Sequence, residues 1–325
     1  MPQSDDCLIE SAAMTEPGTT SALADAAARR ADHTKLIKAA TYASLAVAIT
    51  LILSKAWAWR ATDSVSILSS LADSALDVIA SALTFWAVRF ALSPADHEHR
   101  FGHGKSEGLA ALLQSAIIMV SGMYVCYSAV LRFFEPQPVL QTSTGLLVMS
   151  ISIVLTLLLV AFQTHVSRRT GSVAIAADAA HYRSDVAVNL GVAGALVIAA
   201  TTGWQLADPI VGFAVGLFIL WTVVEIASRS LDILLDREIP DSDRKAIISI
   251  ATGHPKIMGL HDMKTRFGGK HYIVQFHLEL RPETTLWDTH KILDEVEDEI
   301  MAEYPGCEII IHADPFGFPE KRDEF

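Results

Sequence analysis

The 325-residue chain is more apolar and less charged than an ordinary soluble domain, with 51% hydrophobic residues, 19% charged residues and a mean hydropathy of +0.35. Its formal net charge of -12 and its low aromatic content of 8% exclude nucleic acid as a partner, because that partner requires a basic face. The cysteines Cys7, Cys126 and Cys307 are odd in number and scattered, which excludes a disulfide framework and a paired-cysteine metal site. The composition therefore indicates an integral membrane protein in contact with the lipid bilayer.

The N-terminal residues 1–32 are rich in Ala, Ser, Thr, Asp and Glu and lack the apolar core of a cleavable signal peptide. We therefore expect a mobile cytoplasmic N-terminal tail there. Six apolar runs follow, each long enough at ~1.5 Å per residue to cross a hydrocarbon layer of ~30 Å. The predicted spans cover approximately residues 38–59, 64–92, 106–133, 142–165, 173–201 and 208–226. They predict a six-helix transmembrane domain over residues 33–235.

The positions of the Lys and Arg residues predict the orientation of these spans. Basic residues gather before the first span, between the second and third, between the fourth and fifth, and after the sixth. Loops rich in Lys and Arg stay on the cytoplasmic side of a membrane. Both termini are therefore expected in the cytoplasm.

The last part of the chain, residues 236–325, changes to short amphipathic elements and is acidic, with 19 Asp or Glu against 11 Lys or Arg. Pro240-Asp241 is predicted to open a helix, with Asp241 or Ser242 as its cap. The next predicted elements are strands at Leu260–Arg266 and His271–Leu280, a helix at Trp287–Tyr304 and a strand at Glu308–His312. The order helix, strand, strand, helix, strand predicts an α+β domain of ferredoxin-like type in the cytosol.

Two of the predicted spans carry pairs of metal-ligand side chains. His181 and Asp185 lie four residues apart within the run 173–201, and Asp73 and Asp77 repeat this spacing in the second span. Each pair lies on one helix face, and ionisable groups inside a membrane are costly and usually functional. One imidazole nitrogen and three carboxylates suit a tetrahedral divalent cation, with zinc first and cadmium or ferrous iron behind. The sequence thus predicts a divalent-metal site inside the membrane.

With a DxxxD pattern on the second span, an HxxxD pattern on the fifth and an acidic α+β tail, the chain resembles the cation diffusion facilitator family. The similarity is greatest to its bacterial zinc and ferrous-iron efflux proton antiporters, and covers all but about the first 30 residues, where chains tolerate change. This resemblance implies a transport domain over residues 33–235 and a cytosolic metal-binding domain over residues 236–325. It also implies a homodimer in the bacterial cytoplasmic (inner) membrane.

The resemblance implies four groups of functional residues. The transport site would be Asp73, Asp77, His181 and Asp185; a loop metal site would be Asp96, His99 and His103; a binuclear cytosolic site would be His261, His277, His290, His312 and Asp314; and a dimer charge pair would be Lys105 and Asp236. Zinc would then be both the cargo and a structural or regulatory ion of the cytosolic domain.

The implied mechanism is efflux of a divalent metal in exchange for protons, by alternating access around the membrane site; this is secondary active transport, not enzyme catalysis. Metal binding needs a neutral imidazole and ionised carboxylates, so protons and metal compete for the same atoms. His181 is the expected proton carrier, because an ordinary imidazole titrates near ~6.5.

Two other functions fit parts of the sequence. His99 and His103 form an HxxxH box, as in membrane di-iron enzymes, although such enzymes need several boxes. A membrane-anchored metal sensor would use the acidic tail, but it would not need ligands within its spans. A membrane zincin is disfavoured because the chain has no HExxH motif. Metal flux into sealed vesicles would separate transport from both alternatives.

Overall fold

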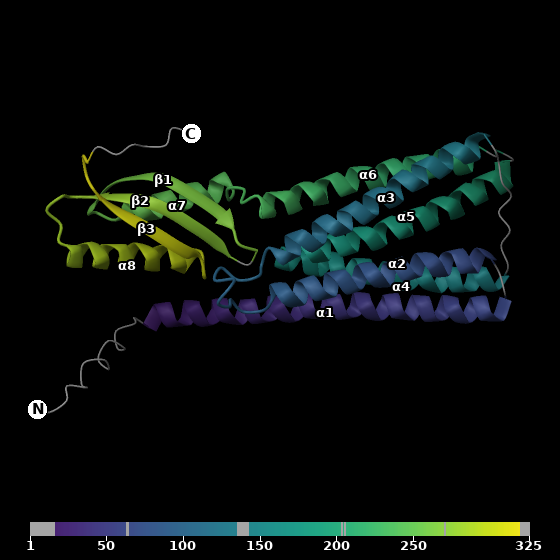
Figure 1. The fold of residues 1–325 in the computed structure, drawn as a ribbon, viewed down its shortest axis with the longest axis horizontal. Coiled ribbons are helices and arrows are strands. Elements are labelled where there is room, and N and C mark those ends of the chain that lie inside the picture. The colour runs from purple at the N-terminus through teal and green to yellow at the C-terminus, as the bar shows by residue number, and fades with distance from the viewer. Residues whose placement is uncertain are drawn as a thin grey trace, which may run out of the picture. The chain divides into compact units, whose positions relative to one another are not determined.

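A computed structural model describes residues 17–62, 65–134, 143–202, 204, 206–269 and 271–318. The chain divides into two compact units, one made mainly of His33–Arg237 and the other mainly of the residues from Glu238 onward. Figure 1 shows the first unit as long helices and the second as a small sheet with helices.

The helices of the first unit are α1 Pro17–Thr62, α2 Val65–Ala91, α3 Ser106–Phe134, α4 Ser143–Thr170, α5 Val173–Thr202 and α6 Ala207–Leu234. They run lengthwise beside one another (Figure 1). Helix α5 contacts α2, α3, α4 and α6, and α3 packs along α6. The helix that carries His181 is therefore the central element of this unit.

Five helices in the described part of the chain are long and apolar enough to cross a membrane: Ala31–Arg60, Asp73–Ala91, Ser106–Phe134, Ser150–Thr170 and Pro209–Leu234. Large apolar side chains point outward from them, including Trp57 at 69% and Trp221 at 72% exposure, as expected for a surface that faces lipid. Helix α5, with its charged side chains, is not among the five, so the fifth predicted span, over residues 173–201, stays a prediction.

Helix α1 is longer than the first apolar run. It begins at Pro17, so residues 17–32 continue the helix where the sequence predicted a mobile tail. Alanine is the strongest helix former and proline is favoured in the first helical turn, which together explain this extension. The tail predicted for residues 1–16 lies outside the described residues.

The second unit contains α7 Asp241–Gly253, β1 Ile257–Phe267, β2 Tyr272–Leu280, α8 Leu286–Glu303 and β3 Glu308–Pro315. The sheet order is β1-β2-β3, and β2 and β3 are parallel, with His277 opposite His312. A parallel pair needs a crossover connection, and α8 supplies it. The predicted element order of an α+β domain is confirmed.

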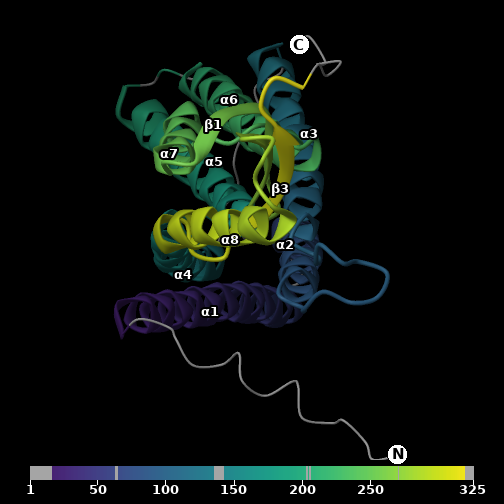
Figure 2. The same ribbon diagram turned by 90° about the vertical axis from the view of Figure 1, so that its left-hand side faces the viewer.

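One face of this sheet forms the core of the second unit. Val274, Phe276 and Leu278 on β2 are fully buried and share a cluster with Ile247 of α7 and Val296 of α8. Figure 2 shows both helices on the same side of the strands. Because side chains alternate along a strand, the residues between the core positions of β2 point to the opposite face. That face is therefore available for polar chemistry.

The start of α7 differs from the prediction. Pro240 is the N-cap residue, and no side chain makes a capping hydrogen bond there, so the assignment of Asp241 or Ser242 as the cap is wrong. Asp241 is instead the first helical residue, where its negative charge still interacts favourably with the helix dipole.

Candidate metal sites

The membrane cluster joins α2 to α5. His181 Nε2 lies 3.1 Å from Asp77 Oδ1 and 3.9 Å from Asp185 Oδ2. Ligand atoms of these three residues lie within 4.8 Å of one another. The imidazole is largely buried, with 7% of its side chain exposed. One nitrogen and two carboxylates therefore converge at a buried contact between helices, as the i, i+4 spacing on α5 predicted.

A chain of hydroxyl groups fixes the helices next to this cluster. Tyr182 and Ser81 are bonded through their side-chain oxygens at 2.7 Å, and Ser81 and Ser44 at 2.9 Å. All three residues are almost completely buried. The chain links α1, α2 and α5 one residue after His181 and one helical turn after Asp77, and thus sets the rotation at which α2 faces α5. No sequence pattern predicts this chain of hydroxyls, because the two serines and the tyrosine carry no distinctive spacing.

The fourth predicted ligand, Asp73, does not join the three-residue cluster. It is exposed and lines a cavity of about 340 Å³ together with Tyr124, Arg132, Val188 and other residues of α3, α5 and α6. It lies one helical turn before Asp77, and residues at that spacing are separated by about 5–6 Å between their Cβ atoms. Its role as a ligand stays a prediction.

Two more ionisable groups within the long helices escaped the sequence analysis. Asp178 on α5 is fully buried and accepts a hydrogen bond of 2.5 Å from Gln163 Nε2 on α4. Lys55 on α1 donates to Ser74 Oγ of α2 at 2.7 Å. Both residues interrupt apolar runs, and that interruption is the signal by which they could have been found.

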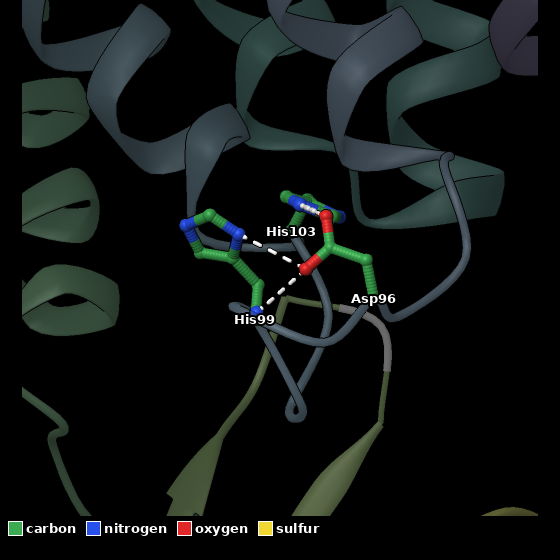
Figure 3. Close-up of side chains that lie close together, drawn as sticks. All are labelled: Asp96, His99 and His103. Atoms are coloured by element: carbon green, nitrogen blue, oxygen red, sulfur yellow. Dashed lines mark hydrogen bonds and ion pairs between the residues drawn. The ribbon is translucent and has the colours of Figure 1, made fainter.

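The loop between α2 and α3 brings together all three of its predicted ligands (Figure 3). Asp96 Oδ1 lies 3.3 Å from His99 Nδ1, and Asp96 Oδ2 lies 3.3 Å from His103 Nε2. The two rings lie 4.7 Å apart, and His103 also packs against Phe90 at 4.3 Å between ring centroids. Carboxylate and imidazole ligands thus face one another across a short loop.

Backbone donors hold the Asp96 carboxylate in place. Oδ1 accepts hydrogen bonds from the backbone N–H of His99 at 2.7 Å and of Glu98 at 2.9 Å. The bond from the His99 amide is the main reason that the pKa of Asp96 lies below its ordinary value. The ionised form, which a metal requires, is therefore favoured before any ion binds.

The third cluster lies on the face of the sheet opposite the core. Asp314 Oδ2 is 2.8 Å from His277 Nδ1 and 3.5 Å from His261 Nε2, while Asp314 Oδ1 is 3.1 Å from His312 Nε2. The parallel register of β2 and β3 produces this arrangement by placing His277 opposite His312. The two oxygens of one buried carboxylate thus face different histidines, which is the geometry needed to bridge two ions.

Two residues differ from the predicted cytosolic set. His290 is exposed on α8, with Nε2 3.7 Å from Asp294 Oδ2, and the described structure does not bring it to the other ligands. Glu279, which was not predicted, lies 3.4 Å from His261 Nδ1. Glu279 could have been predicted from the sequence, because it follows His277 by two residues and so lies on the same face of the strand.

The predicted charge pair is formed within this chain. Lys105 Nζ lies 2.8 Å from Asp236 Oδ1, and both side chains are a little over one-third exposed. Asp236 adopts the left-handed backbone conformation at φ 56° just after α6. The pair therefore connects the segment before α3 to the end of α6; its role in a dimer stays a prediction.

Together, the apolar helices and the His and Asp clusters define a class: a multi-pass membrane protein with a cytosolic α+β domain and groups suited to divalent metal ions. Two family models match the chain in the same order. The cation efflux transmembrane domain matches residues 41–235, and the cytoplasmic domain of cation efflux proteins matches residues 239–316. The chain belongs to the cation diffusion facilitator family of cation efflux proteins, as its motifs predicted.

The chain is similar over most of its length to curated cation-efflux pumps named FieF. It is 41% identical over 284 residues to the pump of Klebsiella pneumoniae subsp. pneumoniae, 40% to that of Escherichia fergusonii and 39% to that of Shigella boydii serotype 18. Each alignment covers 86% of this chain and 93% of the relative. A solved structure of CzrB in its Zn form is 28% identical, with a TM-score of 0.24, and covers 26% of this chain and 99% of that one. The protein is thus a transporter that exports divalent cations, and not an enzyme.

Proposed function

We propose that the protein exports zinc, and also cadmium or ferrous iron, from the cytoplasm in exchange for protons, by alternating access around Asp73, Asp77, His181 and Asp185. The observation that carries this proposal is the convergence of the Asp77, His181 and Asp185 ligand atoms within 4.8 Å where α2 meets α5. A site that combines an imidazole nitrogen with carboxylate oxygens favours zinc over magnesium or manganese.

The same atoms explain why protons would drive export. A metal ion needs the lone pair of His181 Nε2 and the ionised carboxylates of Asp77 and Asp185. Protonation of the imidazole removes that lone pair and adds a positive charge 3.1 Å from Asp77. Proton entry from an acidic exterior therefore expels the metal, and metal entry from the cytoplasm expels the proton.

The remaining parts of the chain fit this direction of transport. The match of the second unit to a cytoplasmic domain supports cytoplasmic termini and a location in the bacterial inner membrane. The Asp314 cluster would hold resident zinc, and a bridging ion there would reduce the repulsion between acidic tails in a homodimer. The loop cluster around Asp96 would tune the response to metal.

Sealed vesicles test the proposal directly. Purified protein is reconstituted, zinc uptake is followed with an internal dye, and external pH is stepped from about 8 to about 6, where an imidazole of pKa ~6.5 titrates. Asp77→Asn should abolish flux, because it removes an anionic ligand at an intramembrane site. Glu225→Gln, which removes an exposed carboxylate from α6, is the matched control and should retain flux.

A second variant, His181→Ala, tests the role of protons. His181→Ala leaves three carboxylates, so oxygen-preferring ions still bind, but zinc affinity should fall and the pH dependence near neutrality should flatten. A His181→Ala protein with the parent's zinc affinity and pH profile would show that the histidine is neither ligand nor proton carrier.

A further inference from the structure

Lys55 places a positive charge inside the helical unit. It lies within the apolar segment Ala31–Arg60 of α1 and is half-buried. Lysines in membrane helices commonly extend toward the membrane surface. Lys55 Nζ instead donates to two oxygens of α2, Ser74 Oγ at 2.7 Å and the backbone carbonyl of Ser70 at 3.2 Å. Because Ser74 is completely buried, the ammonium group is held against α2.

The bond to Ser74 brings this charge close to the proposed cargo site. Ser74 directly follows Asp73, and Lys55 interacts electrostatically with Asp77, Asp73 and Asp185. Among the described residues Lys55 makes no direct ion pair with any of these carboxylates, and two of its three N–H donors bond to neutral oxygens. The ammonium group is thus bonded to Ser74 beside the carboxylates and does not itself pair with their oxygens.

The charges of the four proposed ligand residues and one divalent cation balance only when Lys55 is counted. Three carboxylates and a neutral imidazole carry three negative charges, and a divalent cation neutralises two of them. In a low-dielectric interior the remaining charge is costly unless it is compensated. The Lys55 ammonium supplies the missing positive charge at a position where it cannot itself occupy the ligand oxygens.

We propose that Lys55 is the fixed counter-charge of the cargo site and that it sets the affinity of the site for divalent cations; this inference rests on the proposed function of Asp73, Asp77, His181 and Asp185. Its charge lowers affinity by repelling the incoming ion, which keeps binding weak enough for release. It also neutralises the loaded site. Lys55 is therefore a positioning residue: it does not contact the cargo ion and acts through the electrostatic effect of its charge on the carboxylates.

The test is the zinc dependence of the initial flux in reconstituted vesicles. Lys55→Met keeps an unbranched side chain, one atom shorter, and removes the charge. The zinc concentration for half-maximal flux should fall about tenfold, which corresponds to about 1.4 kcal/mol, and the maximal rate should fall as well, because the ion leaves more slowly. Lys55→Arg should restore the parent's half-maximal concentration at least in part. Lys38→Met, an exposed lysine on the same helix, is the matched control and should change neither quantity.

A purely structural role gives a different result. Loss of a helix contact would lower the maximal rate and leave the half-maximal concentration unchanged or higher, and either result with Lys55→Met would overturn the proposal. Asp77→Asn is assayed in parallel: if it abolishes flux, an unchanged half-maximal concentration in Lys55→Met refutes only the counter-charge. If Asp77→Asn transports normally, the proposed function itself fails.

A chemical variant covers the case in which Lys55→Met does not fold. Lys55→Cys is reconstituted and modified with a reagent that adds a positively charged aminoethyl group or one that adds a neutral methyl group. The neutral adduct should show the lower half-maximal zinc concentration, and equal values for the two adducts would overturn the proposal. The parent protein, treated with both reagents, corrects for modification of Cys7, Cys126 and Cys307.

Discussion

Zinc is expected to stabilise the C-terminal unit through Asp314. This unit has its own buried core, including Phe276, Val296 and Ile300, so we expect a fragment of residues 238–318 to fold alone. An ion at 100 times its dissociation constant adds about 2.7 kcal/mol of stability at one site. For a domain of this size each kcal/mol raises Tm by about 4–8 °C, so zinc should raise Tm by about 10–20 °C.

Asp314→Asn should remove most of that rise. The carboxylate contacts His261 and His277 through one oxygen and His312 through the other, so a single change weakens every ligand pair in the cluster. Without zinc, the free energy of unfolding of the Asp314→Asn fragment should be only about 1 kcal/mol lower than that of the parent fragment. This is the scale of one side-chain hydrogen bond, and asparagine can still accept from His277.

Differential scanning calorimetry with and without zinc measures both effects on one preparation. Asp298→Asn, an exposed position on α8, removes the same charge outside the cluster and should keep the full zinc response. A folded parent fragment whose Tm does not respond to zinc would refute the assignment of this cluster. An Asp314→Asn fragment with the parent's response would show that zinc binds elsewhere in the unit.

Three further outcomes are expected. Replacing His99 and His103 by Ala should change the metal dependence of flux yet leave substantial transport. Complete loss of flux, with metal still bound at the membrane site, would show that the loop site is essential for transport. Tyr182→Phe removes one buried hydrogen bond of about 1 kcal/mol, so the maximal flux should fall several-fold at unchanged zinc affinity. Burial raises the pKa of the Cys307 thiol from 9.0 to about 11. The stability of the zinc-free fragment should therefore decline between those pH values, because unfolding releases the proton there, and calorimetry at stepped pH measures it.

The sequence predicted those parts of the sites that depend on spacing along one element. His181 and Asp185 share a helix face at i, i+4, and residues 96–103 lie in one loop, so both groups converge as expected. The element order of the C-terminal unit followed from the change of hydrophobic period after Asp236. Local periodicity sufficed in each case because no relation between distant segments was needed.

The rest depended on how neighbouring helices are rotated and tilted, which spacing does not encode. Asp73 shares the DxxxD pattern with Asp77, yet only Asp77 lies against His181, because Asp73 is one helical turn away along α2. Lys55 and Asp178 have no pattern partner in the sequence, and their roles emerge only from the contacts with Ser74 and Gln163 on other helices. Charged residues inside apolar runs are the class for which sequence reasoning needs the three-dimensional structure most.

The three clusters differ in their ratio of nitrogen to oxygen atoms. In the loop and in the C-terminal unit, one carboxylate, Asp96 or Asp314, lies between histidines, so nitrogen ligands predominate. In the membrane the order is reversed, because the single imidazole of His181 lies between two carboxylates. Nitrogen-rich sites hold zinc more firmly than oxygen-rich ones. We infer that the membrane cluster binds its ion weakly enough to release it, whereas the two outer clusters keep theirs. Transport requires that difference, since a carrier site as strong as a structural zinc site would retain its ion.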